Sequence, residues 1–144
     1  FGFVPVCGTY YVQAYTLNMD VLVLSLVSGL AIDTLLMVNN YRDREQDAVS
    51  GKCTLVVRYG RKFGENMYLG LGIAATLLCL WFVNTGRLTL IEFIWAPCVY
   101  LCMHALTWRK MLNIRSGKGL NRILGETSRN MLFLGILLAV ALAA

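Results

Sequence analysis

Charged residues are scarce in this sequence: aspartate, glutamate, lysine and arginine make up 15% of its 144 residues, whereas 58% are hydrophobic. In an average soluble domain about a quarter of the residues are charged, so the composition excludes an ordinary soluble domain. Several hydrophobic runs approach the length of about 20 residues that a membrane-spanning helix needs. The sequence therefore predicts an all-α protein, a multi-pass transmembrane helical bundle that forms a single domain.

Motifs of several soluble enzyme classes are also missing, because no Gly-x-Ser-x-Gly, P-loop or Rossmann fingerprint occurs. The five cysteines include no Cys-x-x-Cys pair. Cys98 and Cys102 lie one helical turn apart near His104, but a zinc site would need two more cysteine or histidine ligands. The cysteines are therefore interpreted as small buried apolar residues. His104 is interpreted as a packing or interface residue, and Glu92 as an interfacial residue at the end of a span.

The hydrophobic runs predict four complete spans and the end of a fifth. The chain begins with Phe1, which we interpret as a cut inside a longer protein. Pro97 predicts a kink in the third complete span. The predicted spans are 1–14 (partial), 21–38, 67–83, 88–107 and 120–143, and the predicted loops are 39–66 and 108–119.

All but one of the thirteen lysines and arginines lie in two polar stretches, 39–66 and 108–130, and the exception is Arg87. Loops rich in lysine and arginine stay on the cytoplasmic side of a membrane. We therefore expect a plasma (inner) membrane protein whose two basic stretches are cytoplasmic. A nucleic-acid-binding protein would not separate its basic loops by spanning helices, so that class is excluded. Anionic lipid headgroups account for part of the basic charge.

The densest run of polar residues follows the first complete span. Asp43 and Asp47 are four residues apart, so on a helix they share a face, with Asn39 one turn earlier. Mg²⁺ takes oxygen ligands and is commonly held by one or two carboxylates together with substrate phosphates. Lys52 and Arg58 follow closely and would meet phosphate charge that the metal leaves uncovered. An isolated Asp-x-x-x-Asp, however, is more often a solvated acidic helix end followed by a basic loop.

The stretch from Asn39 to Gly60 reads N-N-x-R-D-x-x-x-D-x-x-x-G-K-x-T-L-x-V-R-x-G. It resembles the second aspartate-rich motif of the UbiA superfamily of membrane prenyltransferases. More narrowly, it is similar to that of the 1,4-dihydroxy-2-naphthoate prenyltransferases of menaquinone synthesis. The hydrophobic pattern fits the family from about its fifth helix onward, and the family's first aspartate motif is missing. The resemblance implies the C-terminal part of a nine-helix fold, whose partner is the N-terminal half of the same protein.

The resemblance also implies an activity. It is the Mg²⁺-dependent transfer of a polyprenyl group from polyprenyl diphosphate to 1,4-dihydroxy-2-naphthoate, with loss of diphosphate and CO2, giving demethylmenaquinone. Asp43 and Asp47 would bind the Mg²⁺–diphosphate complex, and without the family's partner cluster this piece alone is expected to be inactive. The supporting residues would be Asn39 and Asn40 beside the metal, and Arg42, Lys52 and Arg58 as phosphate ligands or clamps of the loop.

Asp33 lies inside the first complete span, on one face with Asn40 and Asp47. A carboxylate within a span costs about 2.5–3.5 kcal/mol and normally faces protein or a water-filled cavity. Asp33 would lie about 15 Å deeper than Asp43 on an unbroken helix, so it either lines an acceptor pocket or contacts another helix. Two alternative functions stay open. One is a UbiA-type enzyme with another aromatic acceptor, and the other is a cation-binding membrane transporter or binding protein.

Overall fold

The structure is a computed structural model, and it describes residues 2–143. Every regular element in this range is a helix, which confirms the predicted all-α fold. In chain order the helices are α1 (Phe3–Ala14), α2 (Met19–Val49), α3 (Leu55–Tyr59), α4 (Arg61–Leu78), α5 (Leu80–Asn84), α6 (Leu90–Phe93), the π-helical segment η1 (Ile94–Cys98), α7 (Val99–Ile114) and α8 (Leu120–Ala143).

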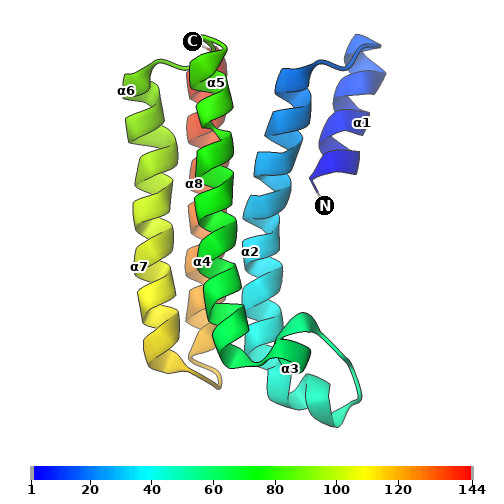
Figure 1. Cartoon of the computed structure of the whole chain (residues 1–144), viewed down its shortest axis with the longest axis vertical. Helices are drawn as coiled ribbons and strands as arrows, with labels where there is room; N and C mark the ends of the chain where they lie inside the picture. The colour runs from blue at the N-terminus through cyan, green and yellow to red at the C-terminus, as the bar shows by residue number, and fades with distance from the viewer. Residues whose placement is uncertain (1, 144) are drawn as a thin grey trace.

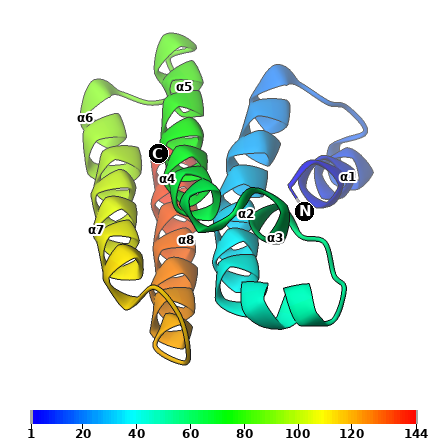
Figure 2. The ribbon, with the colours of Figure 1, turned by 60° about the horizontal axis from the view of Figure 1, so that its bottom comes forward.

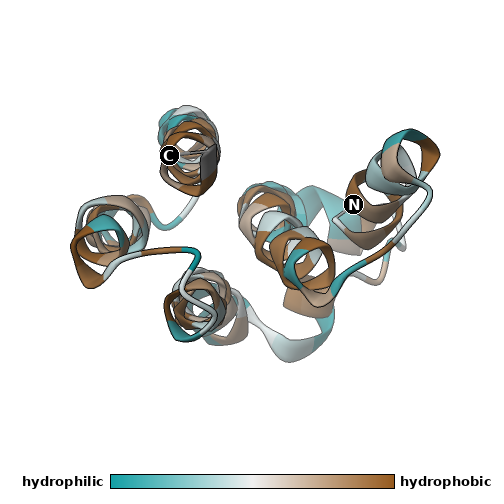
Figure 3. Ribbon diagram, turned by 90° about the horizontal axis from the view of Figure 1, so that it is seen from above, coloured by the Kyte–Doolittle hydropathy of each residue, from teal (hydrophilic) through white to brown (hydrophobic). Residues whose placement is uncertain are grey.

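The long helices stand side by side as columns (Figure 1). Within residues 2–143, four columns are long and apolar enough to cross a membrane: α2, α4 with α5, α6 with η1 and α7, and α8. This confirms a transmembrane bundle. Helices α2 and α7 each pack against both α4 and α8, so the four columns form a ring. Helix α1 lies outside this ring, against α2 (Figure 3).

The ring is filled by two clusters of buried apolar side chains. One lies toward the α1–α2 connection and includes Val27, Phe82 and Leu134. The other lies toward the opposite end and includes Tyr41 and Met111. Large apolar side chains are also exposed on the outside of the columns, where a bilayer would cover them. They include Leu77, Ile94, Leu106 and Leu132.

His104 is fully buried in this ring, as expected for a packing residue. Its Nε2 lies 2.9 Å from the carbonyl oxygen of Tyr68, and its ring stacks on the Tyr68 ring with centroids 4.2 Å apart. Gly72 makes this close approach of α4 and α7 possible, because a Cβ at that position would overlap the imidazole ring. Glu92 lies at a helix end, where its carboxylate accepts hydrogen bonds from the backbone and hydroxyl of Thr89.

The two long polar loops are shorter than predicted. In the stretch 39–66, α2 continues to Val49 and α4 already begins at Arg61. In the stretch 108–119, α7 continues to Ile114. The predictions were wrong because hydropathy marks where apolar residues end, whereas arginine, glutamate, glutamine and lysine are good helix formers.

The third span is irregular where its proline lies. Pro97 is part of η1, so the regular α-helical hydrogen bonding is interrupted there. Proline lacks an N–H and clashes with the carbonyl four residues earlier, and a wider turn relieves both conflicts. The expectation for the cysteines was right for Cys7 and Cys79, which are buried, and wrong for Cys53 and Cys102, which are exposed.

Candidate functional site

The polar end of α2 projects beyond the apolar part of the helix. With 31 residues at about 1.5 Å each, α2 is about 46 Å long, which exceeds the hydrocarbon thickness of about 30 Å. The α7–α8 connection lies at the same end of the bundle (Figures 1 and 2). The two basic stretches of the sequence therefore meet at one end of the molecule, as their charge pattern predicted.

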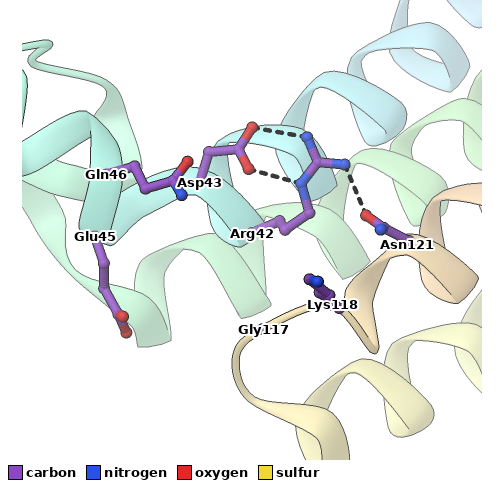
Figure 4. Close-up of a pocket in the computed structure, with 7 residues that line it drawn as sticks. All are labelled: Arg42, Asp43, Glu45, Gln46, Gly117, Lys118 and Asn121. Atoms are coloured by element: carbon purple, nitrogen blue, oxygen red, sulfur yellow. Dashed lines mark hydrogen bonds and ion pairs between the residues drawn. The ribbon is translucent and has the colours of Figure 1, made fainter.

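Arg42 and Asp43 form a two-point ion pair at this end. The Nε of Arg42 lies 2.6 Å from Oδ1 of Asp43, and its Nη2 lies 2.8 Å from Oδ2. The remaining nitrogen, Nη1, donates to Oδ1 of Asn121 at 3.0 Å. Because Asn121 is in the first turn of α8, Arg42 links the carboxylate on α2 to the start of another column (Figure 4).

An open pocket of about 390 Å³ lies between the end of α2 and the start of α8. Lys118 is exposed and has no ion-pair partner among residues 2–143. The pocket thus combines a paired carboxylate with a cation that is available to an anionic ligand. The residues lining it are Arg42, Asp43, Glu45, Gln46, Gly117, Lys118 and Asn121 (Figure 4).

Asp47 belongs to a second, separate ion pair. Its carboxylate is mostly buried, and the Nζ of Lys52 lies 3.3 Å from each of its oxygens. The backbone N–H of Lys52 also donates to the carbonyl of Asp47 at 2.8 Å, in a turn where Gly51 takes a φ of 76°. Glycine reaches this left-handed region without strain. Lys52 therefore fastens the loop that follows α2, and Asp47 does not line the pocket.

The other predicted site residues are farther from this arrangement. Asn39 and Asn40 are partly buried on α2, and their side chains make no hydrogen bond to another part of the described chain. Arg58 is exposed on α3, with its Cζ 5.5 Å from the ring centroid of Tyr59. Asp33 is partly buried deeper on α2. None of these four residues lines the pocket.

The carboxylates at the polar end of α2 offer few of the oxygen ligands that Mg²⁺ requires. Among residues 2–143, no group of three or more histidine, cysteine, aspartate or glutamate side chains gathers where it could hold a metal ion. Asp43 and Asp47 offer hard oxygen ligands, and each is already paired with a cation. These two carboxylates do not form a complete cage by themselves, and only Asp43 lines the pocket, so a metal there would need further ligands such as diphosphate oxygens.

Sequence reasoning missed the contribution of the α7–α8 connection. Lys118 and Asn121 line the pocket, and Nη1 of Arg44 donates to the carbonyl of Arg115 at 3.0 Å. The charge pattern indicated that both basic stretches lie on one side. It carried no signal for which residues meet, since Arg42 and Asn121 are 79 positions apart.

The comparisons with known proteins bear on this site as a whole. Residues 1–134 match the UbiA prenyltransferase family. The chain belongs to this family. The match includes the whole polar end of α2 and the start of α8, so every pocket-lining residue lies in the UbiA family region.

Individual relatives give the same result. The chain is similar to the 1,4-dihydroxy-2-naphthoate octaprenyltransferase of Mycobacterium leprae, with 34% identity over 99% of this chain and 47% of that protein. It is also similar to the Haemophilus influenzae protein of that name, with 39% identity over 55% of this chain and 25% of that protein. The chain spans about half the length of the mycobacterial relatives that it matches. No solved structure matches it.

Proposed function

We propose that the complete protein transfers a polyprenyl group from polyprenyl diphosphate to 1,4-dihydroxy-2-naphthoate. The reaction depends on Mg²⁺ and yields diphosphate, CO2 and the reduced, dihydroxy form of demethylmenaquinone. The observation that carries the proposal is the polar end of α2 in a UbiA family bundle, where Asp43 lines an open pocket and Asp47 follows one helical turn later on α2. The names of the similar proteins support the choice of acceptor.

The chemistry requires a negative leaving group to be stabilised. The bond between the allylic carbon and the diphosphate oxygen breaks, and diphosphate leaves with the bonding electron pair. The electron-rich ring carbon that carries the carboxylate attacks the electron-poor allylic carbon. The acceptor then loses its carboxylate as CO2, which returns an electron pair to the ring. When bound, Mg²⁺ supplies positive charge that stabilises the departing diphosphate.

Several residues of this chain would have distinct roles in the reaction. Asp43 and Asp47 would hold the metal through their carboxylate oxygens, with diphosphate oxygens completing the ligand set. Arg42 and Lys118 lie at the pocket and would provide cationic hydrogen-bond donors where charge develops. The supporting assignments are Asn39 and Asn40 around metal-bound water, Lys52 and Arg58 as loop clamp and phosphate ligand, and Asp33 in the acceptor pocket.

The membrane orientation is part of the proposal. The basic stretches share one end of the bundle, and positively charged loops remain in the cytoplasm. We infer that the protein lies in the plasma (inner) membrane with the pocket on the cytoplasmic side. Two carboxylates leave the metal shell incomplete, so we expect these 144 residues alone to be inactive. Prenyl transfer in membranes that contain only this chain would contradict that expectation.

The test is prenyl transfer by the complete protein in membranes or detergent, with polyprenyl diphosphate, 1,4-dihydroxy-2-naphthoate and Mg²⁺. Mass spectrometry should detect the prenylated product, and trapped CO2 should equal it in amount. Asp43→Asn and Asp47→Asn should abolish turnover, whereas Lys62→Gln, an exposed cation outside the pocket, should leave it unchanged.

Three results would overturn the proposal. Full turnover after thorough chelation of divalent ions would exclude the metal-dependent reaction. Turnover with another aromatic acceptor but none with 1,4-dihydroxy-2-naphthoate would move the protein to a different UbiA-type reaction. A transporter would be indicated by cation flux without any prenylated product. The clustering of Asp43, Glu45 and Asp47 at one end of α2 speaks against transport, because a relay needs carboxylates at mid-membrane on several helices.

A further inference from the structure

The residue directly before the Arg42–Asp43 pair is anchored in the interior of the bundle. The Tyr41 side chain is fully buried, and its hydroxyl donates to Oε1 of Glu65 on α4 at 2.8 Å. Glu65 is itself 9% exposed. A buried carboxylate is costly unless it is paired and hydrogen-bonded, so its presence beside the polar end of α2 calls for a role.

Glu65 is held in place by two further contacts. The Nε of Arg61 lies 3.2 Å from its Oε1, one helical turn earlier on α4. The indole N–H of Trp108 on α7 donates to the Glu65 carbonyl oxygen at 2.9 Å. Three columns, α2, α4 and α7, are thereby joined at the level of Tyr41 through one residue.

The Tyr41 ring fits tightly as well. A Cβ at Gly64 would lie 3.1 Å from Cδ2 of Tyr41 and 3.2 Å from the methyl carbons of Val56. The guanidinium carbon of Arg44 lies 5.0 Å from the centroid of the same ring. Packing on several sides therefore restricts the rotation of α2 about its axis at this residue.

The carboxylates beyond Tyr41 depend on that rotation. Each residue along an α-helix turns the side-chain direction by about 100°, so a fixed Tyr41 fixes the direction of Asp43 two positions later. Beyond Asp43, several residues of the last turns of α2, including Ala48 and Val49, are exposed and provide little packing. The anchor at Tyr41 lies between the packed part of α2 and its projecting end.

We propose that Tyr41 and Glu65 are positioning residues, which set the direction and height at which Asp43 and Asp47 are presented to the metal–diphosphate ligand. The inference rests on the proposed function, because it assigns these two residues to the same site. They touch neither ligand, and they act through the orientation of α2. An apolar contact alone could hold α2 against α4, whereas a directional hydrogen bond also restricts the rotation of α2 about its axis.

The first test measures hydrogen exchange in the complete protein without substrate. Tyr41→Phe and Glu65→Ala remove the hydrogen bond, and amides 43–49 should then exchange about 10- to 100-fold faster. Glu65→Gln keeps an acceptor for the Tyr41 hydroxyl and should stay close to wild type. The control is Tyr68→Phe, which removes another buried tyrosine hydroxyl bond, 2.9 Å from Thr127, between α4 and α8. It should leave exchange at 43–49 unchanged.

The second test is kinetic. Tyr41→Phe and Glu65→Ala should raise the Mg²⁺ concentration for half-maximal turnover by about tenfold, with an unchanged KM for the aromatic acceptor. Tyr68→Phe should shift neither value. The inference would be overturned if amides 43–49 exchange at the wild-type rate in both Tyr41→Phe and Glu65→Ala. It would also be overturned if these variants are active with an unchanged Mg²⁺ requirement. If wild type has no prenyltransferase activity, the proposed function fails, and the exchange result still decides whether Tyr41 and Glu65 fix the end of α2.

Discussion

Two glycines of α4 lie two residues apart and are expected to respond in opposite ways to the same substitution. A glycine at either position would permit close helix approach, but only Gly72 faces a neighbouring side chain. A Cβ at Gly72 would overlap Cδ2 and Nε2 of His104, whereas a Cβ at Gly70 would meet no atom within 4 Å. Gly72→Ala should therefore destabilise the bundle, and Gly70→Ala should not.

The size of the effect follows from the contacts of His104. Its ring is buried and stacked on Tyr68, so it cannot turn away as the end of a flexible chain would. Forcing a methyl group into such packing costs about 1–3 kcal/mol, and displacing Nε2 from the Tyr68 carbonyl adds about 1 kcal/mol. We expect Gly72→Ala to lose about 2–4 kcal/mol. Gly70→Ala should be neutral or gain up to about 1 kcal/mol from helix propensity.

The assay is thermal unfolding of the purified protein in detergent, at matched protein and detergent concentrations. His104→Ala should remove the obstacle, so that Gly72→Ala costs little in that background. The double-mutant cycle should give a coupling of about 1–3 kcal/mol. Equal stability of the two glycine variants, or additive effects of Gly72→Ala and His104→Ala, would refute the reasoning from α4–α7 packing.

Three other substitutions test the polar end of the bundle and its opposite end. Lys118→Gln should raise the KM for polyprenyl diphosphate about tenfold in an assay of the complete enzyme, because a cationic donor at the pocket is lost. Asp47→Asn should weaken the contact of Lys52 with the end of α2, so hydrogen exchange of residues 50–54 should become faster. Asp20→Asn removes the charge that pairs with Arg87 at the far end, and turnover should remain within about twofold of wild type, since an exposed ion pair is worth about 0–1 kcal/mol.

Hydropathy and charge alone predicted the layout of the columns, for physical reasons. The last column, α8, begins at Leu120 as expected, because an apolar run long enough to span a bilayer can satisfy its backbone only as a helix. Burying a charged side chain in lipid is costly in every span, so the lysines and arginines stay in the connections outside the bilayer. The two basic stretches therefore meet at one end. Neither argument depends on contacts between residues that are far apart in the sequence, so both features could be predicted from the sequence alone.

Hydropathy and charge could not predict the ends of the helices or the partners of the site residues. Helices α2 and α7 continue into their polar stretches, where helix propensity and tertiary contacts decide and hydropathy gives no signal. The contacts of Arg42 with Asn121 and of Tyr41 with Glu65 join residues 79 and 24 positions apart. Such pairs follow from how the columns pack, so the spacing rule that placed Asp43 and Asp47 on one face could not find them.

The helical spacing of the two carboxylates also gave no information about the cations that pair with them. Asp43 is held by Arg42 and Asp47 by Lys52, so each acid already has a counter-charge. Arg42, Asp43 and Lys52 are partly open to solvent and Asp47 is mostly buried, so exchanging partners costs less than breaking a fully buried pair. In the proposed reaction, a metal ion that approaches with a diphosphate would bring both signs of charge together. The carboxylates would turn to the metal and the cations to the phosphate oxygens, so the ligand would enter the site without leaving an unpaired charge.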